Sequence, residues 1–236
     1  MIAAAHQPHF LPWPRYLNKL ASAETFIWLD TVTYRKNYFQ NRARVLSREG
    51  EERWLTLPVH AHLDTLLRDV TLADARAPEK VSRTIEQYYH RAPHFAAHWP
   101  ALCEALRTTP PSLSEADLHT LKPILAMLGL SHVRIVRASE LGVTTEEPTD
   151  RLVQLCQRVG ADIYIAGKGG REYMRLDRFA DAGIEVIWQD VDPAALMYQR
   201  SDGRDGSALS VIDPLFHIGA SRTAELTKSA WTAHFR

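Results

Sequence analysis

The N-terminal part of the chain alternates between short apolar segments and one helical segment. Residues 2–5 are apolar enough for a buried strand, and residues 25–29 combine β-branched and aromatic side chains typical of a second strand. Residues 15–23 between them are predicted to form a helix. A strand, a helix and a strand in this order are typical of a parallel sheet, so the sequence predicts an α/β fold.

The same alternation returns in the second half of the chain. We predict further strands at 133–136, 163–166 and 184–188, and helices at 150–159, 172–182, 210–218 and 223–234. Two additional strands are expected at 42–46 and 54–59, around a turn at 48–51, and a polar surface loop at 201–207. Residues 78–130 carry mainly helical patterns, with Pro93 and Pro123 expected at helix starts or breaks.

These elements predict one α/β domain over residues 1–236, with a largely helical segment at about 78–130. The expected architecture is a mostly parallel open sheet of the Rossmann-like kind, and a nucleotidyltransferase-like arrangement is one form of it.

Charge and composition exclude several classes of protein. Lys plus Arg and Asp plus Glu are equal at 28 each, so the chain lacks the basic excess of a general nucleic-acid coat. A few local cations still suffice for a small anionic ligand. No signal-peptide pattern and no apolar run of ~20 residues is present, so we expect a cytoplasmic protein without a membrane partner. The two cysteines, Cys103 and Cys156, lie in apolar helical patterns and are expected to pack in the core.

A stiff, polar loop follows the first predicted strand. His6, Gln7 and Trp13 lie in it, and its prolines fix the backbone angle φ at three positions. Because ligands of open α/β sheets bind beyond the carboxyl ends of the strands, this loop is the first candidate site.

Asp30 ends the second predicted strand and opens a polar cluster. Lys36, Asn41, Arg42 and Arg44 follow it, giving one carboxylate, three cations and one amide in a short stretch. Such cations bind phosphate or carboxylate groups. The alternative is that Lys36, Arg42 and Arg44 are a solvated strand edge.

Six segments of the chain resemble the WbqC-like proteins. They are HQPHFLPWPRYL, LDTVTYRKNYFQNRARV, WLTLPV, YIAGKGGREYM, FADAGIEV and LSVIDPLFHIG, and they match in order from Ile2 to Gly219. The resemblance implies an enzyme of bacterial O-antigen or other small-molecule and secondary-metabolite biosynthesis. Aminoacyl (glycyl) transfer to a sugar is the reaction that it implies.

The resemblance also marks individual positions. They are Gln7, Pro8, Pro12, Tyr16, Asp30, Tyr34, Lys36, Asn41, Arg42, Gly167, Tyr173, Asp213 and Gly219. The chain departs from the family at Pro14 and Arg15, where an apolar residue and a glycine are usual. The family accepts Met at the position of His6, and Asn at the position of His217, so His217 is interpreted as a hydrogen-bonding group.

The leading hypothesis is a metal-independent group transferase for a small molecule. Asp30, Lys36 and His6 are the predicted catalytic residues, with Asp30 orienting or deprotonating the acceptor. The predicted substrate-binding residues are Gln7, Trp13, Tyr16, Tyr34, Asn41, Arg42, Arg44, Lys168, Tyr173, Asp213 and His217. We expect the substrate to be anionic or carrier-bound, and we expect no nucleic-acid partner. The sequence indicates neither a cofactor nor an oligomeric state.

Other readings of the same residues stay open. His6 and His9 with Lys168 around a triphosphate would make the protein a nucleotidyltransferase. A non-catalytic ligand-binding protein would instead have the Asp30 cluster paired internally. Asp213, before Pro214, is either catalytic or structural, with Arg42 or Arg44 as its partner.

The four-residue spacing of His90, His94 and His98 is that of histidines that share a metal on one helix. Pro93 interrupts such a helix and no HExxH motif is present, so no metal site is predicted.

Overall fold

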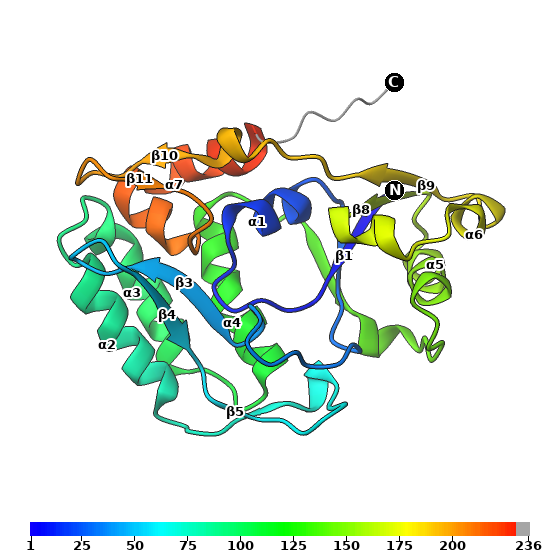
Figure 1. Cartoon of the computed structure of the whole chain (residues 1–236), viewed down its shortest axis with the longest axis horizontal. Helices are drawn as coiled ribbons and strands as arrows, with labels where there is room; N and C mark the ends of the chain where they lie inside the picture. The colour runs from blue at the N-terminus through cyan, green and yellow to red at the C-terminus, as the bar shows by residue number, and fades with distance from the viewer. Residues whose placement is uncertain (230–236) are drawn as a thin grey trace.

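Parallel strands form the central sheet of the protein (Figure 1). The computed structural model describes residues 1–229. Within them the sheet has five strands, in the order β7 (Arg134–Arg137), β2 (Thr25–Trp28), β1 (Ile2–His6), β8 (Ile163–Ala166) and β9 (Glu185–Trp188). Every neighbouring pair in this order is parallel. The predicted parallel α/β fold is therefore confirmed.

Both faces of the central strands are buried. Along β1, Ala4 packs in one core and its neighbours Ala3 and Ala5 pack in the other, because successive side chains of a strand point to opposite faces. Strand β2 alternates in the same way, with Phe26 on the first face and Ile27 on the second. The continuous apolar runs of the sequence are what a sheet covered on both sides requires.

Helices cover the two faces. The first core includes residues of α1 (Pro14–Ala21), α4 (Leu113–Met127) and α7 (Ile212–Ser229), whereas α5 (Pro148–Val159) and α6 (Leu176–Asp181) pack against the second. Figure 1 shows α5 and α6 at one end of the molecule, and α2 (Ala77–Tyr89) with α3 (Phe95–Arg107) at the other.

The segment between β2 and β7 adds a helical layer and four short strands, which form two antiparallel pairs. Helices α2, α3 and α4 pack in succession, as predicted for 78–130, and the antiparallel hairpin of β3 (Arg42–Leu46) and β4 (Glu52–Thr56) lies against α2. Strand β4 ends at Thr56, and β5 (Val59–His60) pairs separately with β6 (Thr71–Leu72). The prediction of one strand over 54–59 was therefore too long.

The remaining elements are short. They are the antiparallel pair β10 (Tyr198–Gln199) and β11 (Asp205–Gly206), and the 3-10 turns η1 (Leu67–Asp69), η2 (Ala138–Leu141), η3 (Lys168–Glu172) and η4 (Pro193–Leu196).

Three predicted helix boundaries differ from the structure. Pro123 lies inside α4 and does not break it, since only the preceding turn loses a hydrogen bond. Helix α6 begins at Leu176, because η3 occupies the first part of the predicted helix. The two predicted helices at 210–218 and 223–234 form α7, which is interrupted at Gly219 (φ +82°), while positions 230–234 lie outside the described residues.

None of the helices in residues 1–229 is both long and apolar enough to cross a membrane.

Candidate active site

The main cavity of the described chain lies where the strand order reverses. From β1 the chain moves outward to β2 and β7, and then returns to place β8 and β9 on the other side of β1. The carboxyl ends of β1 and β8 therefore diverge into a crevice, which is the general ligand position of open α/β sheets. A cavity of about 610 Å³ occupies this point.

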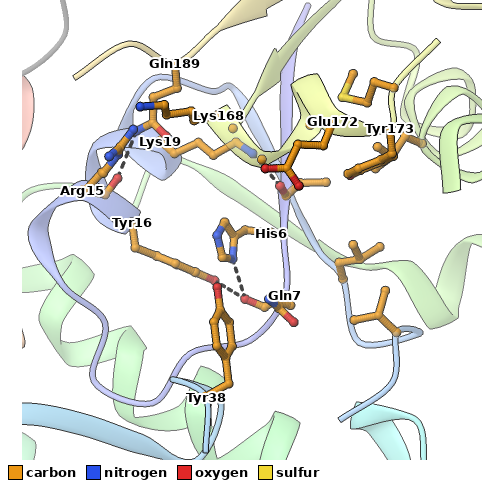
Figure 2. Close-up of a pocket in the computed structure, with 18 of the residues that line it drawn as sticks. His6, Gln7, Arg15, Tyr16, Lys19, Tyr38, Lys168, Glu172, Tyr173 and Gln189 are labelled. Carbon is orange, nitrogen blue, oxygen red and sulfur yellow. Dashed lines mark hydrogen bonds between the residues drawn. The ribbon is translucent and has the colours of Figure 1, made fainter. Parts of the chain in front are cut away.

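The lining of the pocket comes from segments that follow four strands, together with α1 (Figure 2). His6 is the last residue of β1 and Gln7 follows it, and Gln189 follows β9. The other lining residues with polar or aromatic side chains are Trp13, Arg15, Tyr16, Lys19, Thr33, Arg35, Tyr38, Tyr164, Lys168, Glu172 and Tyr173.

Cations outnumber carboxylates in this pocket. Arg15, Lys19, Arg35 and Lys168 line it, and Glu172 is its one carboxylate among the lining residues. Like charges gathered around a cavity create a field that attracts the opposite charge. The pocket is therefore suited to an anionic ligand.

The orientation of the His6 ring defines its tautomer. Its Nδ1 lies 2.9 Å from the carbonyl oxygen of Gln7. Because a carbonyl oxygen only accepts, Nδ1 carries the proton, and Nε2 is left as an acceptor. Burial, and then the nearby Lys19 charge, lower the pKa of His6 to about 3, so the ring is neutral at neutral pH.

Lys19 is a buried lysine that faces the pocket. Its side chain is 3% exposed, and Nζ donates to the carbonyl oxygen of Ala5 at 2.8 Å. No carboxylate of residues 1–229 lies within ion-pair distance of it. Burial lowers the pKa of Lys19 to about 7, because the charged form loses the water that stabilises it.

Gln7 holds the pocket loops in place. Its side-chain oxygen accepts from Nε2 of the fully buried Gln40 at 2.6 Å, and its backbone oxygen accepts from Tyr16 at 3.3 Å. Gln40 in turn accepts from the backbone N–H of Arg35. The position that the family resemblance marks at Gln7 therefore joins the loop after β1 to the segment after β2.

Glycines allow the turn after β8 to approach α1 closely. A Cβ on Gly167 would lie 3.6 Å from Nζ of Lys19, and one on Gly170 would lie 2.5 Å from the sulfur of Met174. A side chain at position 170 would therefore require the flexible end of Met174 to move. This turn carries Lys168 and Glu172 to the pocket.

Aromatic rings pack together beside the pocket, and two of them, Trp13 and Tyr38, line it. Trp13 stacks on Phe39 at 5.4 Å between ring centroids, and Phe39 lies against Trp54, which is 43% exposed. Tyr38 packs against Phe39 and lines the pocket beside Trp13.

Six of the predicted site residues line this pocket. They are His6, Gln7, Trp13, Tyr16, Lys168 and Tyr173. Residues from both ends of the sequence thus come together, as expected for a site at a strand-order reversal. Eight other predicted residues lie elsewhere: Asp30, Tyr34, Lys36, Asn41, Arg42, Arg44, Asp213 and His217.

Asp30 and Lys36 do not face the pocket, in contrast to the sequence-based expectation. Asp30 is 2% exposed, and its two oxygens accept from the backbone N–H and the hydroxyl of Ser139, at 2.9 and 2.6 Å. It joins the end of β2 to the turn after β7. Lys36 is exposed on the loop that follows β2.

The remaining polar residues of the Asp30 cluster stabilise the β3–β4 hairpin. Asn41 donates to the carbonyl oxygen of Leu57 at 2.8 Å, and the guanidinium of Arg42 lies 4.0 Å from the ring centre of Trp54. Arg44 donates to Ala208 at 3.0 Å and pairs with Glu52. Tyr34 packs against the first core. Contacts within the protein hold these side chains, although Oδ1 of Asn41 and Nε of Arg42 are buried without a hydrogen-bond partner among the described residues.

Asp213 belongs to a buried group that we call the Asp213 cluster: Tyr89, Tyr198, Arg200 and Asp213. The Asp213 side chain is fully buried and accepts from the hydroxyls of Tyr89 (2.8 Å) and Tyr198 (2.6 Å). It also forms an ion pair with Arg200, so the expectation of Arg42 or Arg44 as its partner was wrong. None of the four residues of the Asp213 cluster lines the pocket.

His217 is close to this cluster and away from the pocket. Its Nδ1 shares a hydrogen bond with the hydroxyl of Ser201, at 2.7 Å. This contact is consistent with the hydrogen-bonding role inferred from the sequence.

Three further expectations concern groups outside the pocket lining. His9 is 2% exposed and packs against His6 and Tyr16 instead of lining the pocket. Cys156 is buried, and burial raises the pKa of its thiol to about 12, so it packs in the core as predicted. Within residues 1–229, no three His, Cys, Asp or Glu side chains are grouped to hold a metal.

Sequence reasoning missed several lining residues. Arg15 and Lys19 lie four positions apart on α1, with Tyr16 between them, so one helix face presents all three. This spacing was the available signal. Tyr38, Glu172 and Gln189 carried no signal of their own.

Residues 7–225 match the WbqC-like protein family. The chain belongs to this family. It is 31% identical over 221 residues to the uncharacterized protein Rv1507c of Mycobacterium tuberculosis, and the match covers 91% of this chain and 92% of that protein. No solved structure matches the chain significantly. The family resemblance expected from the sequence is confirmed.

Proposed function

We propose that this WbqC-like protein is an enzyme that transfers an acyl or aminoacyl group to a small-molecule acceptor. The donor is an activated acyl compound, such as a thioester or an acyl phosphate, with an anionic portion. The acceptor is an amine or hydroxyl compound, and the family resemblance favours a sugar precursor of bacterial O-antigen or secondary-metabolite biosynthesis.

One observation supports this proposal most strongly: a cation-rich pocket at the strand-order reversal also contains a neutral, oriented imidazole. Arg15 and Lys168 supply positive charge for the donor, and His6 offers Nε2 as an acceptor for the N–H or O–H of the acceptor substrate. Binding both partners in one cavity lowers the barrier through proximity. The volume of about 610 Å³ lies within the range of small-molecule sites.

Transfer is tested by incubating the protein with glycyl and acetyl thioesters or acetyl phosphate, each with amino-sugar and hexose acceptors. Mass spectrometry then detects the acylated acceptor. We expect a product that disappears in the double variant Arg15→Met/Lys168→Met. Pyrophosphate binding without transfer from any of these donors would identify a ligand-binding protein without catalytic activity.

Ligand binding is tested separately, by calorimetry with pyrophosphate. Arg15→Met and Lys168→Met should each weaken binding about tenfold, because each removes one charge contact of ~1–2 kcal/mol. Lys36→Met is the matched control, since it removes an exposed lysine outside the pocket. Equal affinities in all variants would contradict the site.

Nucleotidyl transfer is the second candidate, because nucleotides commonly bind where the strand order of an α/β sheet reverses. His6 and Lys168 line the pocket as this reading requires, but the buried His9 does not. Calorimetry with nucleoside triphosphates and magnesium separates the two candidates. Absence of binding at millimolar concentration would eliminate this one.

A further inference from the structure

We propose that Lys19 is the general base of this site, the residue that takes the proton from the acceptor substrate. This inference rests on the proposed function, because it assigns a role within that reaction. Lys19 was not among the catalytic or binding residues predicted from the sequence.

The hydrogen-bonding environment of Lys19 suits a neutral amine. An ammonium group has three N–H donors, and each needs an acceptor when it is buried. Within residues 1–229, the protein offers Nζ one hydrogen-bond acceptor, the carbonyl oxygen of Ala5 at 2.8 Å. A neutral amine that donates there retains a lone pair to accept a proton. Lys19 lines the pocket, so the acceptor substrate can approach that lone pair.

Burial, rather than neighbouring charge, disfavours a permanent positive charge on Lys19. Figure 2 shows the side chains of Lys19, His6, Lys168 and Glu172 around the same pocket. The titratable or charged groups that face it are Arg15 on α1, His6 at the end of β1, Tyr164 on β8, Lys168, Glu172 and Tyr173 after β8, and Cys156 on α5. Glu172 is the one acidic side chain among the pocket lining and is exposed, whereas Arg15 and Lys168 add positive charge.

The pKa of the Lys19 amine suits a general base. Burial lowers the pKa of Lys19 to about 7. A general base is most effective when its pKa is close to the working pH. The pKa of His6, about 3, makes its imidazole the weaker base of the two, so Lys19 removes the proton of the reacting group and His6 orients the acceptor by accepting from another of its N–H or O–H groups.

The step is balanced without any oxidant or reductant. The nitrogen or oxygen of the acceptor attacks the carbonyl carbon of the donor as its proton moves to Nζ of Lys19. The tetrahedral intermediate collapses, the bond to the thiolate or phosphate leaving group breaks, and a new amide or ester bond remains. The leaving group or water then removes the proton from Lys19.

The first test measures the amine without requiring activity. Trace labelling with isotopic acetic anhydride from pH 5 to 10, followed by peptide mass spectrometry, gives the titration of each lysine. We expect Lys19 to titrate near pH 7, while a reference lysine peptide titrates at about 10.4. Lys19→Met identifies the signal by removing it. A Lys19 that titrates like the peptide, or that does not react at any pH, overturns the proposal.

The second test measures the reaction. Lys19→Met and Lys19→Arg should both lower the transfer rate about 10²- to 10⁴-fold, because neither side chain takes up a proton at neutral pH. In the wild type, kcat/KM should rise tenfold per pH unit up to about pH 7 and then level. Lys168→Met should change KM and leave this midpoint in place. Full activity in Lys19→Met overturns the assignment of Lys19 as the base. If instead Lys19 titrates near pH 7 in the labelling experiment but no transfer product forms with any donor, the proposed function is rejected.

Discussion

Two buried groups of charged side chains in this protein differ in how completely they are paired. In the Asp213 cluster, the carboxylate receives two tyrosine hydroxyls and a guanidinium, all within the protein. In the pocket, the described residues offer Lys19 one carbonyl acceptor and leave Nε2 of His6 without a partner. Both arrangements bury ionisable groups, but only the second leaves hydrogen-bonding capacity directed at a cavity.

The difference separates structural from functional polar residues. A buried charge is stable when its partners satisfy it, and it is costly when they do not. Proteins retain incompletely satisfied groups mainly where a ligand or a reaction completes them. The sequence predicted Asp213 and Lys168 as parts of one site. The structure places Asp213 in the paired cluster and Lys168 in the pocket.

Removing the carboxylate of the Asp213 cluster should have the largest effect on stability. Asp213→Ala leaves Arg200, which is 4% exposed, without its buried partner, although the half-buried Asp202 still contacts it. We expect a loss of ~3 kcal/mol in the free energy of unfolding, measured by urea denaturation. Pyrophosphate affinity of the folded variant should stay unchanged. A loss below 1 kcal/mol would show that the cluster is not a structural ion pair.

Lys19→Met should stabilise the protein, in contrast to Asp213→Ala. Because the folded pKa of Lys19 is about 7 and the ordinary value is 10.5, the unfolded chain binds more protons between these pH values. Wild-type stability should therefore rise with pH across this window, by at most ~1.4 kcal/mol per unit. Below pH 7 the wild type bears the full cost of the buried charge. The gain in unfolding free energy from Lys19→Met is therefore largest there, and it vanishes toward pH 10.5. Urea denaturation at pH 6, 7.5 and 9 measures it, and a gain that grows with pH would contradict the assignment.

Replacing Asp30 should have a small effect that is confined to stability. Asp30→Asn keeps one acceptor for Ser139 and weakens the other contact. We therefore expect a loss of ~1 kcal/mol in the free energy of unfolding, with unchanged pyrophosphate binding and transfer rate.

Replacing the exposed Lys36 should have the smallest effect, since Lys36→Ala should change the free energy of unfolding by no more than ~0.5 kcal/mol. Loss of transfer in either variant would return the catalytic assignment to the cluster after β2.

Local patterns predicted most of the fold correctly. The strand at 163–166 was predicted with its observed bounds, and the strands at 2–5 and 25–29 were displaced by one residue at their ends. These segments were predictable because a strand that is buried on both faces must be apolar throughout. Boundaries that depend on glycine and proline packing, such as the start of α6, were not predictable from periodicity.

The position of Lys19 was hidden by the packing of α1. Pro14 to Ala21 has no exposed face, because the helix lies between the sheet and α7, where Asn18 donates to the carbonyl oxygen of Thr227. The partner helix is about two hundred residues away in sequence, so nothing near α1 indicates that a lysine there must be buried.

The sequence by itself determined that this chain forms a parallel α/β sheet, that it resembles the WbqC-like family, and that the loop after the first strand contributes to a site. Those conclusions depend on local periodicity and on motifs of adjacent residues. Only the tertiary structure decided which polar residues face the cavity. Asp30 is satisfied by Ser139 and Asp213 by Arg200, whereas Lys19 is left with one acceptor beside the turn at Gly167. Pairing between distant segments fixes that difference, and no short stretch of sequence encodes it.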